Sequence, residues 1–333
     1  MEPLILPRIS NQKPLVSVIS ITYNHEPFIR ACLEGFMMQQ TSFPVEFIIH
    51  DDASTDHTAD IIREYYQKRP DLFHVIIEKE NLYSQHKPIM QPLYDMAQGK
   101  YVALCEGDDY WIDPLKLQKQ FNYMEQHPQC NVCSHRVKVY EEFSSSKMED
   151  RKIKEGDYYA GDILKNNLYF YMCSLFYKRS FFLAEKPSFF RRNACAEIGI
   201  VLYMVKDSYC HQFSDIMGTY RLQNRNSVSK KDRSTRENYR DLMQRCLLFW
   251  RDVDTFFDHK YTIPISYKIR FCEDGIGCSS SNFFKRFYYY ISHKKSFKKE
   301  MTKYYTRLVF IPNFYVYNKL RFAYNGLKRA ISR

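Results

Sequence analysis

The sequence predicts an α/β fold, in which a mostly parallel sheet is flanked by helices and followed by a helical, basic C-terminal extension. Through the first 135 residues, short β-branched runs alternate with segments whose apolar residues recur at helical spacing. Strands that alternate with helices in this way form parallel sheets with helices on both faces. Basic residues gather instead after residue 280, where a helical pattern continues.

The alternating part begins with an apolar run at residues 15–21, bounded by Pro14 and by the polar Thr22. Each later strand is likewise a short apolar run that ends in polar residues. The helix that follows the second strand has Thr55 or Asp56 as its expected N-cap. We expect strands over residues 15–21, 45–50, 73–78 and 101–104, and helices over 28–40, 57–68, 90–98 and 114–127.

Beyond residue 130 the alternation is less regular. Polar and serine-rich stretches, typical of loops, interrupt the apolar runs. We expect strands over residues 131–140, 170–177 and 211–216, a helix over 196–205, loops over 141–156 and 224–236, and helices from about 235 to the end.

Composition excludes several classes of protein. The 333-residue chain has 45% hydrophobic and 26% charged residues, which is an ordinary globular balance. No apolar run approaches the roughly 18 residues of a spanning helix, and the N-terminus lacks a signal-peptide pattern. We therefore expect a cytoplasmic protein with reduced thiols. Cys130 and Cys133 form a lone C-x-x-C without a second pair, so a zinc site is not expected.

The basic charge belongs to the C-terminal region. Residues 281–333 hold 13 Lys and Arg against a single acid, Glu300, a net +12, whereas the whole chain carries +11. The same region is rich in Phe and Tyr. A basic aromatic helix can lie on an anionic membrane surface, or it can pack its rings on the rest of the chain. No nucleic-acid-binding motif accompanies the charge, so nucleic acid is not an expected partner.

Carboxylates cluster where the fourth strand ends. The run from Cys105 to Trp111 contains the adjacent Asp108 and Asp109, and two carboxylates at the end of an apolar strand are costly unless a cation neutralises them. Gly107 allows a tight turn there. Hard oxygen ligands suit Mg²⁺ or Mn²⁺ that also holds a diphosphate. The alternative is an acidic turn that caps the next helix.

Two further polar clusters end the first and second strands, and together these three clusters predict a ligand site. They are Thr22-Tyr23-Asn24 and Asp51-Asp52. Ligands of parallel sheets gather at the carboxyl ends of the strands. The chain lacks both the G-x-G-x-x-G and the G-x-x-x-x-G-K-[ST] patterns, so side chains and a metal would have to hold a diphosphate.

These motifs together resemble the family 2 glycosyltransferases, which are inverting enzymes with a GT-A fold. The resemblance runs from about residue 14 to 229. Residues 16–24 are similar to the family's opening strand and nucleotide-binding turn, residues 51–56 to its D-D-x-S-x-D, and residues 106–109 to its D-x-D-D. The extended form, residues 105–117, is similar to bacterial members that build surface polysaccharides.

The resemblance implies a nucleotide-sugar pocket. Thr22, Tyr23 and Glu26 would line it for the base and the ribose, with Tyr23 stacking on uracil. Asp52, together with Asp51, would accept the uracil imide N–H. The structural alternatives are an ordinary turn at Thr22 and a helix cap at the aspartates.

The resemblance also implies a metal and a contact to the phosphates. Asp108 would touch the ribose or the metal, and Asp109 would coordinate Mg²⁺ or Mn²⁺, which stabilises the leaving diphosphate. Arg221 belongs to a stretch similar to the family's Y-R-x-H, in which Gln223 replaces the His. Arg221 or Arg225 would supply the positive charge.

An inverting transfer needs a base, which the family places as an Asp near the start of a helix. Here Glu197 holds that position, with one more methylene. The structural alternative is an acid favoured by the helix dipole, and Asp207 and Asp215 are the other candidates for the base. Trp111 is expected to be a packing residue rather than a sugar platform.

The expected activity is that of a metal-dependent hexosyltransferase. It would move a sugar from a UDP-sugar to a glycan or lipid-linked acceptor in capsule, O-antigen or lipopolysaccharide synthesis, peripherally on the cytoplasmic face of the inner membrane. A GT-A domain would span residues 1–232, with a nucleotide half at 14–135 and an acceptor half at 136–232, followed by a basic helical region at 233–333. The alternatives are a non-catalytic homologue and a nucleotidyltransferase.

Overall fold

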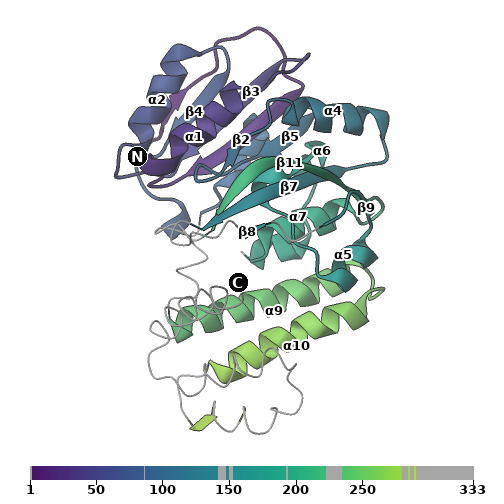
Figure 1. Cartoon of the computed structure of the whole chain (residues 1–333). Coiled ribbons are helices and arrows are strands. Elements are labelled where there is room, and N and C mark those ends of the chain that lie inside the picture. Colours follow the sequence, from purple (N-terminus) through teal and green to yellow (C-terminus); the bar gives the residue numbers. More distant parts are fainter. Residues whose placement is uncertain are drawn as a thin grey trace, which may run out of the picture. The chain divides into compact units, whose positions relative to one another are not determined.

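In the computed structural model the chain divides into two compact units (Figure 1). Unit 1 holds Met1–Lys186 and Glu197–Leu222, and unit 2 holds Pro187–Ala196 and Gln223–Arg333. The structure describes residues 2–85, 87–141, 148–149, 153–192, 194–222 and 235–279, together with Phe284, Lys285 and Tyr289. The predicted domain boundary at residue 232, the loop over 224–234, Gln223, Arg225 and most of the basic tail lie outside the described residues.

Unit 1 is built on one sheet, in the strand order β1-β4-β3-β2-β5-β10-β7-β11-β6. Strands β4, β3, β2 and β5 run parallel, as do β7 and β11, whereas β1, β10 and β6 pair antiparallel with their neighbours. The strands are β1 Leu4–Leu6, β2 Val16–Thr22, β3 Val45–Asp51, β4 Phe73–Ile77, β5 Tyr101–Leu104, β6 Tyr110–Trp111, β7 Val132–Glu141, β8 Met148–Glu149, β9 Gly156–Tyr158, β10 Phe176–Lys178 and β11 Cys210–Leu222.

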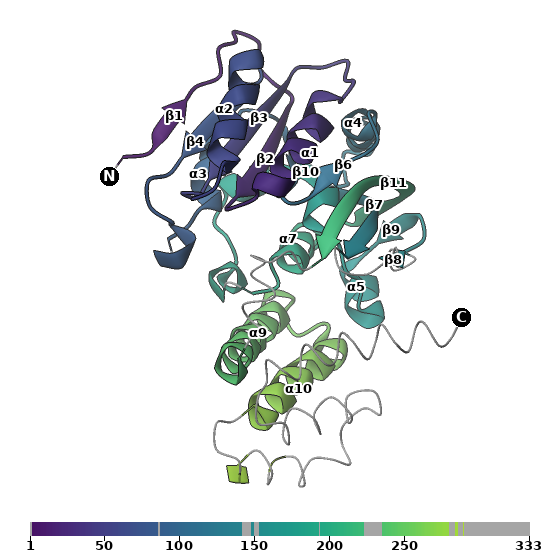
Figure 2. The same ribbon diagram turned by 60° about the vertical axis from the view of Figure 1, so that its left-hand side comes forward.

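Helices cover this sheet, as Figure 2 shows for α1 and α2, which lie side by side along the parallel strands. On α1 an apolar stripe faces the sheet, where the Phe36 ring packs 5.5 Å from Phe47 and 4.9 Å from Trp111. The helices of unit 1 are α1 Glu26–Met37, α2 Thr58–Lys68, α3 Met90–Met96, α4 Lys116–Gln126, α5 Ala160–Asn166, α6 Ser180–Leu183 and α7 Ala196–Met204, whose first residue belongs to unit 2. The predicted α/β class with a sheet flanked by helices is confirmed.

The strand register brings three turns to one edge of the sheet. Thr22 at the end of β2 pairs with Asp51 at the end of β3, and Ile19 of β2 pairs with Leu104 at the end of β5. Since these strands are parallel, the polar residues that follow each of them emerge at the same edge. The alternation predicted for the first 135 residues therefore positions the site.

The strand expected over residues 170–177 is wrong in its first half. A 3₁₀-helix, Met172–Ser174, precedes the short β10. Trp111 Nε1 donates to the Cys173 carbonyl (2.8 Å) and Gln120 Nε2 donates to the Ser174 carbonyl (3.0 Å). Because side chains already pair these carbonyls, this segment does not continue the strand ladder. Trp111 itself is 1% exposed, so it is the packing residue that we expected.

Four other expectations are corrected. The strand expected at 211–216 begins at Cys210 and extends to Leu222, so Tyr220 and Arg221 lie within β11. The loop at 141–156 gives way to the short strands β8 and β9, and α5 and β1 were not expected. The expected N-cap Asp56 lies two residues before the helix start at Thr58, yet its Oδ1 accepts the Thr58 N–H at 3.0 Å.

Unit 2 contains the two long helices α9 (Arg236–Phe256) and α10 (Thr262–Cys278) and the 3₁₀-helix Ser188–Arg192. The side chain of Thr235 caps α9 by accepting the Asn238 N–H at 3.1 Å. Phe189 packs on Phe249 of α9 at 5.5 Å between ring centroids. Within the described residues, none of the helices has the length and the apolar character that crossing a membrane requires.

Candidate active site

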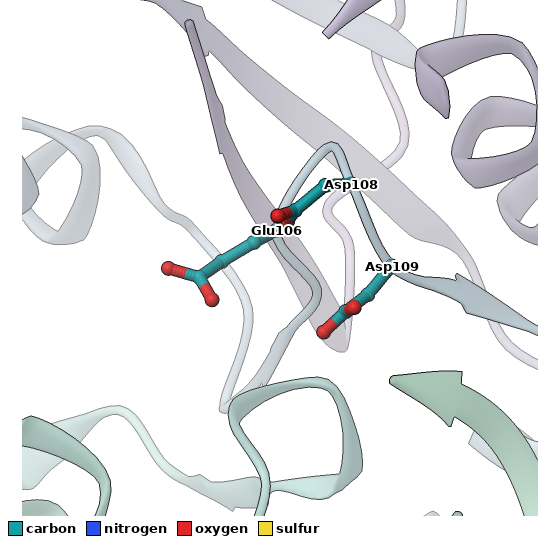
Figure 3. A group of neighbouring side chains, drawn as sticks. All are labelled: Glu106, Asp108 and Asp109. Atoms are coloured by element: carbon teal, nitrogen blue, oxygen red, sulfur yellow. The ribbon is translucent and has the colours of Figure 1, made fainter. Parts of the chain in front are cut away.

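Three carboxylates project from the turn between β5 and β6 (Figure 3). Glu106, Asp108 and Asp109 each offer an oxygen, and these oxygens lie within 4.8 Å of one another. Asp109 is 1% exposed, whereas Glu106 and Asp108 are half-buried. In the described part of the chain, this is the one group of three or more His, Cys, Asp or Glu side chains that could hold a metal ion.

Arg221 of β11 faces this turn. Its backbone N–H donates to Asp109 Oδ1 at 2.8 Å, and its guanidinium donates to the Asp108 carbonyl. The guanidinium lies over the ring of Tyr110 at 4.4 Å and near the ring of Phe28 at 5.1 Å, which fixes its plane. Arg221 therefore shapes the turn and leaves one positive charge beside the carboxylates.

Burial and like charge make the acidic turn electrostatically costly. Burial, together with the neighbouring Asp108 and Glu197, raises the pKa of Glu106 to about 8. Burial and the charges of Asp108 and Glu106 hold the pKa of Asp109 well above its usual range. A divalent cation would remove this repulsion and favour the ionised carboxylates.

Asp109 carries a specific sign of a missing ligand. Its buried Oδ2 has no hydrogen-bond partner among the residues that the structure describes. The Cys173 thiol, a weak donor, also favours the ionised form of Asp109, but burial outweighs it in the pKa. A buried carboxylate oxygen without a full hydrogen-bond partner is rare. The hard oxygen set of Glu106, Asp108 and Asp109 therefore fits Mg²⁺ or Mn²⁺.

Gly107 packs directly on the turn after β2. A Cβ on Gly107 would lie 2.7 Å from Thr22 Oγ1 and 3.0 Å from His25 Nδ1, so a larger residue would displace one of them. His25 Nε2 lies 4.0 Å from Asp108 Oδ2. The predicted pocket residue Thr22 is thus in contact with the acidic turn.

Asp51 and Asp52 occupy the turn after β3 and are both fully engaged. Asp51 accepts the side-chain hydroxyl and the backbone N–H of Ser54, the latter at 3.1 Å. Asp52 Oδ1 accepts the Leu82 N–H at 2.7 Å, and Oδ2 accepts the Tyr83 N–H at 3.1 Å. Asp52 therefore anchors the segment that follows β4, and its contact with a base stays a prediction.

Side-chain hydrogen bonds join the turns after β2 and β3. Asn24, at φ 54°, donates its N–H to Ser54 Oγ (2.8 Å) and accepts the Thr55 N–H on Oδ1 (2.7 Å). Glu26 Oε2 accepts the His57 N–H at 3.1 Å. Glu26 thus joins two turns, whereas Tyr23 is 38% exposed and accessible to a ligand. The roles predicted for both residues stay predictions.

Glu197 lies near the start of α7, and its charge contributes to the raised pKa of Glu106 in the acidic turn. Burial raises the pKa of Glu197 itself. Tyr169 donates its hydroxyl to Glu197 Oε1 at 3.1 Å. Asp215, an alternative candidate for the base, is ion-paired with Lys119 at 2.7 Å, and Asp207 is exposed.

Sequence reasoning missed three neighbours of this site. Glu106 was recognised as part of a motif but not assigned to the metal cluster, although its spacing alone places it on the same turn. His25 follows the predicted pocket residues directly and could have been inferred from its position. Tyr169 comes from a loop 28 residues before Glu197 and carries no sequence signal.

Comparisons with known proteins agree with this geometry. Residues 17–199, more than half of the chain, match the family model described as glycosyl transferase family 2. An uncharacterized protein of Mycobacterium tuberculosis is 50% identical over 126 residues, which are 37% of this chain and 35% of that protein. UDP-Glc:alpha-D-GlcNAc-diphosphoundecaprenol beta-1,3-glucosyltransferase WfaP of Escherichia coli is 35% identical over 111 residues, 33% of this chain and 41% of WfaP. The chain thus spans less than half the length of these relatives.

Solved structures show the same fold. Residues 1–349 of TarS from S. aureus, in complex with UDP-GlcNAc, align with a TM-score of 0.54 and 16% identity over 88% of this chain and 79% of that one. The mannosyltransferase PcManGT from Pyrobaculum calidifontis, in complex with GDP-Man and Mn²⁺, aligns with a TM-score of 0.51 and 15% identity over 92% of this chain and 88% of that one. Since the family model covers more than half of the chain, the chain belongs to glycosyltransferase family 2.

Proposed function

We propose that this family 2 member is a glycosyltransferase, and specifically a metal-dependent, inverting hexosyltransferase that uses a UDP-sugar. The unpartnered Oδ2 of Asp109, within a cluster of three carboxylates, is the observation that carries the metal proposal. Asp109 and Asp108 would hold Mg²⁺ or Mn²⁺, with Glu106 beside them. The ion would stabilise the negative charge of the leaving diphosphate.

Donor binding is assigned to the turns after β2 and β3. The exposed Tyr23 ring would stack on uracil, with Thr22 and Glu26 beside it and Asp52 and Asp51 at the imide edge. Arg221 would place its charge near the phosphates. TarS, which shares the fold, is described in complex with UDP-GlcNAc, and this supports a nucleotide-sugar donor.

Glu197 is proposed as the base. It takes the proton from an acceptor hydroxyl, whose oxygen forms a bond to the anomeric carbon as the bond from that carbon to the diphosphate oxygen breaks. The electron pair leaves with the nucleoside diphosphate. Burial favours this role, because it raises the pKa of Glu197 and so makes the carboxylate a better proton acceptor.

A glycan or lipid-linked acceptor in surface-polysaccharide synthesis, such as that of capsule, O-antigen or lipopolysaccharide, is proposed for the reaction. Support comes from WfaP, whose name describes a diphosphoundecaprenol-linked acceptor. Such an acceptor lies at a membrane, and we place the protein peripherally on the cytoplasmic face of the inner membrane.

A stripe on α10 supports this membrane contact. Ile263, Tyr267 and Phe271 recur every four residues and are 74%, 61% and 39% exposed. The following region, residues 281–333, carries a net +12 in sequence. An exposed apolar stripe that is followed in the sequence by a basic region suits an anionic lipid surface.

A vesicle assay tests the membrane contact. We expect the protein to sediment with vesicles that contain phosphatidylglycerol and less with vesicles of phosphatidylcholine alone. Ile263→Glu with Tyr267→Glu should weaken sedimentation, whereas Ile9→Glu, at a residue of unit 1 that is 66% exposed, should not. Equal sedimentation of all three proteins would argue against a role for the α10 stripe.

A donor screen tests the catalytic proposal first. The melting temperature is measured with UDP, GDP, CDP, UDP-glucose and UDP-N-acetylglucosamine, each with and without Mn²⁺. A ligand that binds only the folded state raises it by mass action. We expect a Mn²⁺-dependent rise with uridine nucleotides. No rise with any nucleotide would favour a non-catalytic homologue, and release of diphosphate from a nucleoside triphosphate and a sugar phosphate would favour a nucleotidyltransferase.

A further inference from the structure

Tyr169 stands out because its hydroxyl reaches the proposed base from a segment without regular structure. It lies between α5 and the 3₁₀-helix Met172–Ser174, yet it donates to Glu197 Oε1 at 3.1 Å. Burial, with the nearby charge of Glu197 as the next cause, raises the pKa of Tyr169 far above its usual value. Tyr169 therefore keeps its proton and can donate it to the Glu197 carboxylate.

The ring of Tyr169 is held by two further tyrosines. Its centroid lies 5.1 Å from that of Tyr171 in an edge-to-face arrangement, and Tyr171 lies 4.8 Å from Tyr220. Tyr220 belongs to β11, which also carries Arg221. The row of rings thus extends from the strand beside the acidic turn to the base, which limits rotation of the Tyr169 side chain.

Glu197 needs such support because its side chain is long. A glutamate has three side-chain torsions, so its carboxylate has more positions available than an aspartate at the same site. A single hydrogen bond to Oε1 removes most of that freedom and leaves Oε2 for the proton of an acceptor. Small errors in the placement of a reacting group lower the rate steeply.

We propose that Tyr169 is the positioning residue of Glu197. Its hydrogen bond to Oε1 orients Oε2 of the glutamate towards the acceptor hydroxyl, and Tyr169 itself does not touch the substrate. The inference rests on the proposed role of Glu197 as the base. It adds a residue that neither the family motifs nor the sequence spacing indicates. Its effect falls on the chemical step, and binding of the donor is unaffected.

The test is a double-mutant cycle of Tyr169→Phe and Glu197→Gln, read by hydrolysis of UDP-glucose with Mn²⁺, where water takes the place of the acceptor. We expect Tyr169→Phe to lower kcat by about 10- to 100-fold, the range for a lost hydrogen bond to a charged group, with KM unchanged. In the Glu197→Gln background the same change should have little further effect.

Tyr65→Phe is the matched control. Tyr65 also donates its hydroxyl to a glutamate, Glu34, but this pair joins α2 to α1. Its loss should lower stability and leave kcat unchanged. The rise in melting temperature with UDP and Mn²⁺ should survive in every variant, because none of them removes a proposed donor or metal contact.

Two results would overturn the inference separately from the proposed function. If Tyr169→Phe has the kcat of the wild type while Glu197→Gln is inactive, the positioning role of Tyr169 is rejected and the role of Glu197 stands. An active Glu197→Gln rejects the base and Tyr169 with it. Urea unfolding of the wild type, the two single variants and the double variant measures what this hydrogen bond contributes to stability in the absence of a nucleotide sugar. Additive losses of stability would show that the pair does not interact.

Discussion

The turns after β3 and β5 carry the same pair of residues in opposite environments. Asp52 of the first pair has both carboxylate oxygens occupied by the N–H groups of Leu82 and Tyr83. Asp109 of the second pair has one oxygen on the Arg221 N–H and one with no partner in the described structure. The protein itself thus supplies hydrogen bonds to both carboxylate oxygens of Asp52, but to only one of those of Asp109.

This difference in hydrogen bonding suggests that Asp52 mainly stabilises the fold and that Asp109 mainly serves function. A carboxylate whose partners are all supplied by the protein contributes to folding, and its removal leaves buried N–H groups unpaired. A carboxylate that lacks a partner lowers stability until a cation arrives. The comparison therefore predicts opposite consequences for similar substitutions in the two turns.

The largest effect is expected for Asp109→Asn. It removes the charge of the buried oxygen that we assign to the metal, and turnover should fall by about 10³-fold or more. The Mn²⁺-dependent rise in melting temperature should disappear, while the melting temperature without metal stays the same or increases. Turnover equal to that of the wild type would reject the metal proposal.

Asp52→Ala should act mainly on stability. The N–H groups of Leu82 and Tyr83 would lose their acceptors, at a cost of about 2 kcal/mol in the free energy of unfolding, measured in urea. Asp60→Ala is the control, since the Asp60 side chain is 66% exposed in a surface ion pair and should change stability by less than about 0.5 kcal/mol. Equal losses in the two variants would contradict the anchor role.

A pH-dependent effect on stability is expected at Lys116. Lys116 is fully buried with its Nζ 3.9 Å from the Trp111 ring centroid, and burial lowers its pKa to about 8. Below pH 8 the folded protein must hold a buried ammonium, so Lys116→Met should be the more stable protein. Between pH 8 and about 10.5 the unfolded chain binds a proton that the folded chain does not.

The free energy of unfolding of the wild type should therefore rise relative to Lys116→Met across that range, by at most about 1.4 kcal/mol per pH unit. Denaturant unfolding of both proteins at several pH values measures the difference. A constant difference from pH 7 to 10 would show that Lys116 titrates normally.

The sequence predicted the turns that follow β2, β3 and β5 better than the surroundings of Glu197. Thr22, Asp51 and Asp109 each follow a strand with a clear apolar pattern, and parallel pairing then brings them together. Tyr169 follows no periodic element, and only the packing of distant segments brings it to Glu197. Lys116 contradicts the usual exposure of lysine, so its burial under Trp111 could not be inferred from composition.

The hydrogen bonds between the turns after β2 and β3 limit which substitutions these turns can accept. Asn24 Oδ1 accepts both the backbone N–H and the side-chain hydroxyl of Thr55, across 31 residues of sequence. A change at Asn24 removes the acceptor of both groups, whereas a change at Thr55 removes only the hydroxyl and keeps the backbone N–H. Among the relatives of this chain, substitution should therefore be slower at the position of Asn24 than at that of Thr55.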